Sequence, residues 1–151
     1  MEKMIETKFL ITKTSGGVLH AILAQSSQEK EESNGKLRPI ILLMHGFSGE
    51  KNEWGRYTHT AEMLSNAGYD SLRFDFTGSG ENDREPITLK KQVEDVAEVV
   101  NWVKSQGYQK IGAIGLSFGG LTLLIANNPD IMVNVFWAPG FYFKYIMKPS
   151  Q

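Results

Sequence analysis

The chain of 151 residues contains no cysteine. This absence excludes a disulfide framework, a thiolate metal site and a cysteine nucleophile. The sequence also lacks an excess of either charge: 16 basic and 17 acidic residues give a net charge of -1, so no basic face for nucleic acid is expected. Long apolar runs are missing too, and those such as Ile40–Met44 are far too short to cross a bilayer.

Residues 1–7 alternate charged and apolar side chains and lack the apolar core of a signal peptide. We therefore expect a cytoplasmic protein without a membrane span, a nucleic-acid partner, a metal or a cofactor. The hydrophobic content of 41% suffices for a buried core, and the length suits one domain that comprises residues 1–151.

The order of apolar segments predicts an α/β fold. Residues 9–14 and 18–24 form a predicted hairpin, and the polar residues 25–38 form a predicted mobile loop. Further along, strands are predicted at residues 39–44, 69–76, 110–116 and 132–137, and helices at residues 57–67, 88–107 and 118–126. This alternation favours a three-layer sandwich with a mostly parallel sheet, whose ligand crevice lies at the carboxyl ends of the strands.

Ser117 is the central residue of the sequence Gly115-Leu116-Ser117-Phe118-Gly119. A Gly-x-Ser-x-Gly pattern is weak evidence by itself, but this one lies between an apolar strand and an apolar helix. That position is typical of a nucleophile elbow, where glycines two residues before and after the serine allow a sharp turn. The alternative is a glycine-rich turn whose serine caps the following helix.

A second glycine-rich segment, His45-Gly46-Phe47-Ser48-Gly49, follows the strand predicted at residues 39–44. Acyl transfer needs two backbone N–H donors for the developing oxyanion, one from such a loop and one from the residue after the nucleophile. The backbone amides of Phe47 and Phe118 are therefore the candidate oxyanion hole. We expect His45 to pack and hold the loop, whereas Gly46 and Gly49 could also belong to an ordinary turn.

A third segment, Asp75-Phe76-Thr77-Gly78-Ser79-Gly80-Glu81, follows the strand predicted at residues 69–76. It lacks the Gly-x-Gly-x-x-Gly and Lys-Ser/Thr patterns of phosphate-binding loops, and acidic residues surround it. Asp75 is therefore predicted to fix the geometry of the loop; the alternative is that it acts as the acid of a catalytic triad.

Together these three segments resemble the α/β-hydrolase superfamily, in particular its monoacylglycerol lipase, feruloyl esterase and serine aminopeptidase-like group. The resemblance implies that Ser117 is the nucleophile, that Phe47 and Phe118 supply the oxyanion-hole amides, and that residues 45, 46, 115 and 119 support the site. It also implies an eight-stranded sheet, with the acid and the histidine of the triad after the serine.

The sequence departs from that pattern because His20, His45 and His59 all precede Ser117, and Asp130 is the one carboxylate after it. A helix of about nine residues carries Asp130 roughly 14 Å from Ser117, toward the wrong edge of the sheet. We therefore expect an incomplete domain that is truncated after the sixth strand, with a triad that is incomplete in this chain. The strand at residues 132–137 becomes an exposed edge for self-association or for a complementing fragment.

Four interpretations of function follow. The leading one is a serine hydrolase that acts on small-molecule carboxylic esters. The alternatives are a serine aminopeptidase-like hydrolase, a non-catalytic protein for binding or subunit association, and a gene-fragment product.

Overall fold

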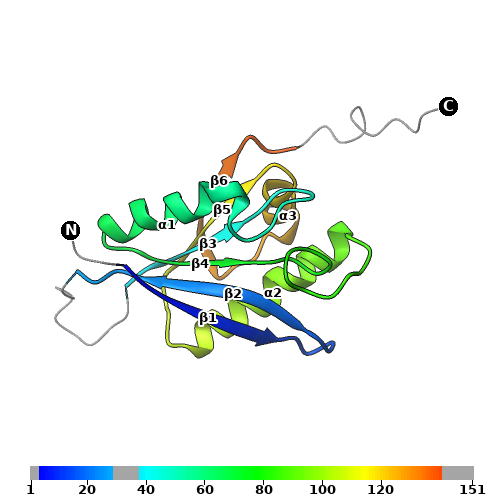
Figure 1. The fold of residues 1–151 in the computed structure, drawn as a ribbon. Helices are drawn as coiled ribbons and strands as arrows, with labels where there is room; N and C mark the ends of the chain where they lie inside the picture. The colour runs from blue at the N-terminus through cyan, green and yellow to red at the C-terminus, as the bar shows by residue number, and fades with distance from the viewer. Residues whose placement is uncertain (1–3, 29–37, 141–151) are drawn as a thin grey trace.

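The computed structural model describes residues 4–28 and 38–140, which form a mixed sheet of six strands with helices on both faces (Figure 1). The order across the sheet is β1-β2-β4-β3-β5-β6. Strand β2 runs antiparallel to β1 and β4, whereas β4, β3, β5 and β6 run parallel. The strands are β1 (Ile5–Thr12), β2 (Val18–Gln25), β3 (Ile40–Met44), β4 (Asp70–Phe74), β5 (Ile111–Leu116) and β6 (Ile131–Trp137).

Three α-helices complete the layers: α1 (Arg56–Asn66) contacts β4 and β2, while α2 (Leu89–Ser105) and α3 (Phe118–Ala126) contact each other. A short 3-10 helix, η1 (Glu53–Gly55), precedes α1. In Figure 1, α1 lies on one side of the sheet and α2 on the other. The predicted three-layer α/β sandwich with a mostly parallel sheet is therefore confirmed.

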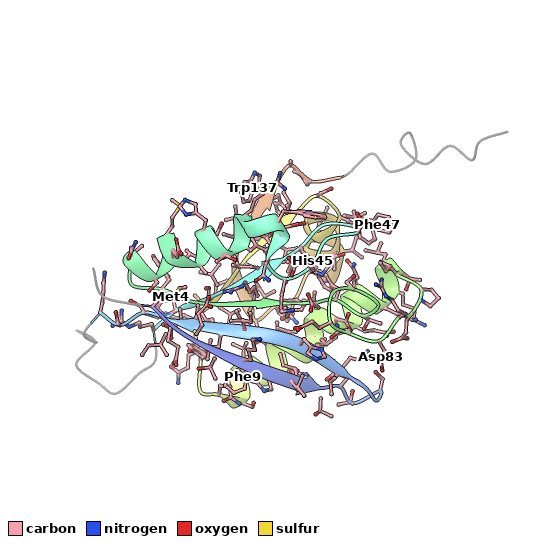
Figure 2. The ribbon with its side chains drawn as sticks, in the orientation of Figure 1. Met4, Phe9, His45, Phe47, Asp83 and Trp137 are labelled. Carbon is pink, nitrogen blue, oxygen red and sulfur yellow. The ribbon has the colours of Figure 1, made fainter. Side chains whose placement is uncertain are left out.

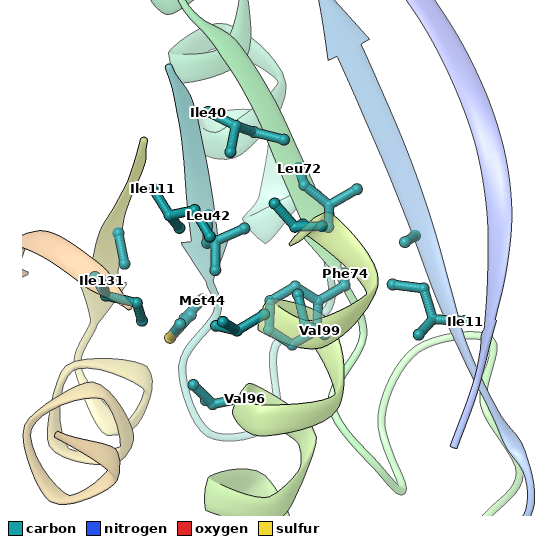
Figure 3. Packing of buried hydrophobic residues seen from close by; sticks show 14 of the residues in the cluster. Ile11, Ile40, Leu42, Met44, Leu72, Phe74, Val96, Val99, Ile111 and Ile131 are labelled. Carbon is teal, nitrogen blue, oxygen red and sulfur yellow. The ribbon is translucent and has the colours of Figure 1, made fainter. Parts of the chain in front are cut away.

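The main core lies between the sheet and α2 (Figure 3). Alternate residues of a strand point to the same face, so Ile40, Leu42 and Met44 of β3 all face this layer. The valines of α2 recur at helical spacing and are fully buried: Val96, Val99, Val100 and Val103. The Thr88 side chain caps α2 by accepting a hydrogen bond from the Lys91 N–H at 3.2 Å.

The element boundaries differ from the prediction mainly in the hairpin. Strand β1 begins at Ile5, four positions before the predicted start, and ends at Thr12. The first residues of β1 are exposed and include charged side chains, so apolar periodicity does not predict this part of the strand. It forms a strand because its backbone pairs with β2. Residues 29–37 of the predicted polar loop lie outside the described residues.

Strand β6 borders the sheet next to β5, and most of its side chains are exposed. The exposed apolar residues of this strand are Met132, Val133, Val135, Phe136 and Trp137. Charges and proline usually protect an edge strand from pairing with another chain. Between Ile131 and Trp137 the sequence offers neither. Among the described residues, no helix is long and apolar enough to cross a membrane.

Candidate active site

Ser117 joins β5 to α3 by a turn that consists of this single residue. Its φ of 51° and ψ of -115° are values that few L-residues adopt. The Ser117 N–H donates to the Trp137 carbonyl at 3.0 Å, and the Ser117 carbonyl accepts from the Gly120 N–H at 3.0 Å and the Gly140 N–H at 3.2 Å. The side chain makes no capping hydrogen bond to α3, so helix capping does not explain the serine. Strained residues of this kind cost about 1–3 kcal/mol and are concentrated at functional sites.

The glycines around Ser117 allow α3 to begin in direct contact with the sheet. A Cβ added to Gly115 would lie 2.7 Å from the Gly119 carbonyl oxygen. One added to Gly119 would lie 2.4 Å from the carbonyl oxygens of both Met44 and His45. The turn therefore depends on glycine at both positions, as an elbow requires.

Replacing Gly119 by alanine is expected to lower the free energy of unfolding by about 3 kcal/mol, at the upper end of the overpacking range. The added methyl group would overlap two backbone carbonyl oxygens, which cannot move away as a flexible side chain would. Urea denaturation measures the effect. Gly46→Ala is the matched control, because its Cβ would meet the Leu116 carbonyl oxygen at an ordinary 3.5 Å. Equal losses in the two variants would contradict this account of the turn.

Residues 45–49 follow β3 and lie beside Ser117; they are called the oxyanion loop below after the role predicted for them. A Cβ added to Gly46 would be 3.5 Å from the Ser117 Cβ, and the Gly49 N–H donates to the Gly46 carbonyl at 3.1 Å. The Phe47 ring meets the Phe118 ring edge to face, with centroids 5.9 Å apart. The structure thus brings the predicted loop and the elbow together, while the role of the Phe47 and Phe118 amides remains a prediction.

His45 is fully buried and has both ring nitrogens engaged. The Phe76 N–H donates to Nε2 at 3.1 Å, so Nδ1 carries the proton that it donates to the Gly46 carbonyl at 2.8 Å. Burial lowers the pKa of His45, although nearby carboxyl groups oppose this, and the ring is neutral at physiological pH. Figure 2 shows His45 inside the molecule, on the same loop as Phe47. This geometry is that of a residue that holds the loop.

The remaining titratable candidates lie away from Ser117. His20 pairs with the Asn82 side chain at 2.8 Å, and the exposed His59 lies 3.6 Å from Glu62 on α1. Asp130 pairs with Lys104 at 2.8 Å. It directly precedes the first residue of β6, whereas Trp137 is the last residue of that strand, roughly 20 Å away. Within the described residues, no hydrogen bond or ion pair connects a histidine or Asp130 to the Ser117 side chain.

Asp75 is fully buried and ties the segment that follows residues 45–49 to the loop after β4. Its carboxylate accepts from the Lys51 N–H at 2.7 Å, from Lys51 Nζ at 2.8 Å and from the Glu81 N–H at 3.0 Å. Lys51 Nζ also contacts Glu81 at 2.7 Å. Burial disfavours the charged ammonium, but the hydrogen bonds that it donates to Asp75 and Glu81 prevail and raise the pKa of Lys51.

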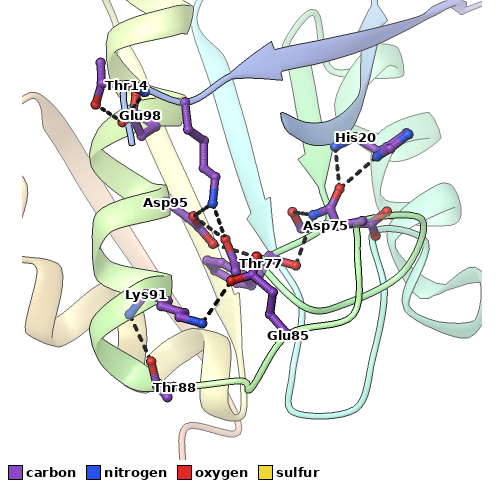
Figure 4. A network of polar contacts seen from close by, with 12 residues as sticks. Thr14, His20, Asp75, Thr77, Glu85, Thr88, Lys91, Asp95 and Glu98 are labelled. Atoms are coloured by element: carbon purple, nitrogen blue, oxygen red, sulfur yellow. Dashed lines mark hydrogen bonds and ion pairs between the residues drawn. The ribbon is translucent and has the colours of Figure 1, made fainter. Parts of the chain in front are cut away.

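A second buried carboxylate, Asp95 of α2, holds the same loop from the other side (Figure 4). It accepts the Thr77 N–H at 2.7 Å and the Thr77 hydroxyl at 2.8 Å, and Lys13 Nζ lies 3.8 Å away. Burial raises the pKa of Asp95 against the opposing effect of the Thr77 hydrogen bonds. The sequence did not predict the buried roles of Lys51 and Glu53, because the burial of a charged residue in a polar segment has no compositional signal. Asp95 is buried as well, although it lies among the charged residues of α2.

Within the described part of the chain, no group of three or more histidine, aspartate and glutamate side chains is arranged to hold a metal ion.

Comparison with known families and proteins gives a consistent result. Residues 35–150 match the family described as serine aminopeptidase, S33. An uncharacterised 31.7 kDa protein of Escherichia coli, from the traX-finO intergenic region, is 38% identical over 97 residues, which cover 61% of this chain and 33% of that protein.

Solved structures share the fold. The α/β hydrolase GrgF from Penicillium sp. sh18 has a TM-score of 0.78 at 24% identity, over 89% of this chain and 46% of that one. Est1E from Butyrivibrio proteoclasticus, solved with ferulic acid bound, has a TM-score of 0.79 at 27% identity, over 91% of this chain and 55% of that one. The chain thus spans about half the length of these structures and about a third of the curated relative.

Proposed function

The chain belongs to the serine aminopeptidase S33 family of α/β hydrolases, and on this premise we propose that it carries the nucleophile and the oxyanion hole of a serine hydrolase acting on carboxylic esters. The observation that carries the proposal is Ser117, held at φ 51° between β5 and α3 with the oxyanion loop beside it. The capping alternative lacks its hydrogen bond, so catalysis is the better explanation for the strain.

The proposed reaction has two steps. Ser117 Oγ attacks the acyl carbon while its proton passes to a base; the base then gives this proton to the leaving oxygen as the ester C–O bond breaks, which yields an acyl-enzyme and an alcohol. Water then cleaves the acyl-enzyme to the carboxylic acid and restores the serine. In both steps the Phe47 and Phe118 amides stabilise the oxyanion.

The base that accepts the Ser117 proton is proposed to come from sequence outside this chain. His45 is committed to holding the loop, and His20 and His59 have partners elsewhere. The matched relatives are about twice as long as this chain, and their additional sequence has room for a histidine and an acid.

Ester substrates are favoured over amides on one observation: Est1E, the more similar of the two structures, binds ferulic acid, a carboxylic acid of the kind that ester hydrolysis releases. The family name keeps aminopeptidase activity as the second candidate. Turnover of p-nitrophenyl acetate against an aminoacyl p-nitroanilide separates the two.

A non-catalytic role in association is the third candidate, and the exposed apolar side chains of β6 favour it. The proposed partner of this edge is a second copy of the chain or a complementing fragment. This role requires a stable fold without turnover that depends on Ser117.

The direct test is labelling with a fluorophosphonate probe, run on the longest natural gene product that contains residues 1–151. An activated serine forms a covalent adduct, and peptide mass spectrometry is expected to place it on Ser117. Heat-denatured protein is the control for non-specific reaction. A folded protein that takes up no label at Ser117 would sink the assignment.

A further inference from the structure

We infer that Glu53 is a positioning residue for the oxyanion loop. The inference rests on the proposed function and adds a residue to it. Glu53 lies in η1, outside the three glycine-rich segments, and its side chain contacts the backbone of the oxyanion loop.

The contacts of the Glu53 carboxyl group are with the loop backbone. The side chain is buried, and Oε1 accepts a hydrogen bond from the Gly46 N–H at 3.2 Å. The same oxygen occupies the space beside Gly49, because a Cβ added there would lie 2.4 Å from it. The loop therefore curves around this carboxyl group and has no room for a side chain at Gly49.

Gly46 connects Glu53 to the nucleophile. A Cβ added to Gly46 would be 3.6 Å from Glu53 Oε1 and 3.5 Å from the Ser117 Cβ, so this residue lies between the two. The hydrogen bond to Glu53 thus fixes the Gly46 N–H, and Gly46 directly precedes Phe47 in the chain. A displacement of Gly46 would move the Phe47 amide relative to Ser117.

The electrostatics argue against a simple role in stability. Glu53 Oε2 is buried without a hydrogen-bond partner in the described residues, and no lysine or arginine there forms an ion pair with Glu53. The groups on which its charge acts are the neutral His45 ring and the Tyr57 hydroxyl. Burying a carboxyl group with one oxygen unpaired and no cation beside it costs free energy, and a role in the site accounts for its presence there.

The backbone at Glu53 is strained as well. Glu53 has a φ of 49° and Trp54 a φ of 57°, two successive non-glycine residues in the left-handed region. The cost of this conformation adds to that of the buried carboxyl group, and its effect is to aim the Glu53 side chain at Gly46.

The test compares variants of Glu53 in fluorophosphonate labelling, with two readings taken separately. The endpoint counts folded sites, and the second-order rate constant reports the oxyanion hole. We expect Glu53→Ala to lower the rate constant about tenfold to a hundredfold with an unchanged endpoint, less than the hundred- to thousandfold for loss of a donor itself. In turnover of p-nitrophenyl acetate, kcat should fall while KM stays constant, since the interaction strengthens in the transition state.

Two further variants keep the test decisive if Glu53→Ala does not fold. The aspartate in Glu53→Asp is one methylene too short to reach the Gly46 N–H, so this variant should be labelled slowly. Glu53→Gln retains an acceptor oxygen and should have most of the wild-type labelling rate constant. Glu50→Ala is the matched control, because the Glu50 carboxyl group bonds to the Asn52 N–H at 3.0 Å and not to the loop glycines.

The outcomes are distinct. Rate constants equal to wild type in every variant, or a lower endpoint with an unchanged rate constant, overturn the inference and leave the proposed function standing. A wild-type protein without label at Ser117 overturns both.

Discussion

Replacing Ser117 by alanine is expected to lower the turnover of p-nitrophenyl acetate on the order of a millionfold, as loss of the nucleophile does in a well-studied serine protease. In the proposed reaction the hydroxyl is the attacking group, and without it the oxyanion donors and substrate binding would leave a small residual rate. Turnover is measured in the longest natural gene product that contains the chain. Stability should not change, because the Ser117 side chain makes no capping hydrogen bond and alanine adopts the same backbone equally well.

The matched control for this prediction is Ser79→Ala, a buried serine in the loop after β4 whose hydroxyl has no partner among the described residues. It should retain wild-type turnover. If wild type, Ser79→Ala and Ser117→Ala all hydrolyse the ester at the same low rate while remaining folded, the non-catalytic role at the β6 edge becomes the better explanation.

Periodicity and glycine placement predicted most of the fold, because both reflect local physics. The valines of α2 recur at the spacing of a buried helical face, and the helix predicted at residues 118–126 has the observed bounds. The same reasoning placed the turn at Ser117, since glycines on both sides of a serine after an apolar strand indicate a sharp bend. Strand β1 was predicted too short because its pairing with β2, which the sequence does not display, extends it through charged residues.

The supporting shell of the site could not be predicted in the same way. Glu53 and Lys51 are charged residues in a polar loop, and such residues are usually exposed. Their burial depends on loops after β3 and β4 meeting at one edge of the sheet, where Asp75 accepts hydrogen bonds from Lys51 and Glu53 accepts one from the Gly46 N–H. The sequence indicated that Asp75 would fix its loop, but the partners of that carboxylate depend on the packing of two loops that are distant in the sequence.

The Asp75 carboxylate yields the second large prediction. Asp75→Ala is expected to lower the free energy of unfolding by about 3–5 kcal/mol, the range for removing one partner of a buried ion pair. The Lys51 side chain is 6% exposed and would lose its buried partner, retaining the half-exposed Glu81. Two backbone N–H groups, of Lys51 and Glu81, would lose their acceptor as well. Urea denaturation of the variant and the wild type measures the difference.

Two further variants show whether Asp75 acts through structure or chemistry. Asp130→Ala breaks an exposed pair with Lys104 and should change stability little, so an equal effect of Asp75→Ala would contradict the buried-pair argument. Asp75→Asn keeps an acceptor for the Lys51 N–H but removes the charge opposite the ammonium, so its stability should be intermediate. Where Asp75→Asn remains folded, Ser117 should still react with the fluorophosphonate probe, because the carboxylate holds two loops together and takes no proton. Loss of labelling at unchanged stability would instead assign Asp75 to the catalytic machinery.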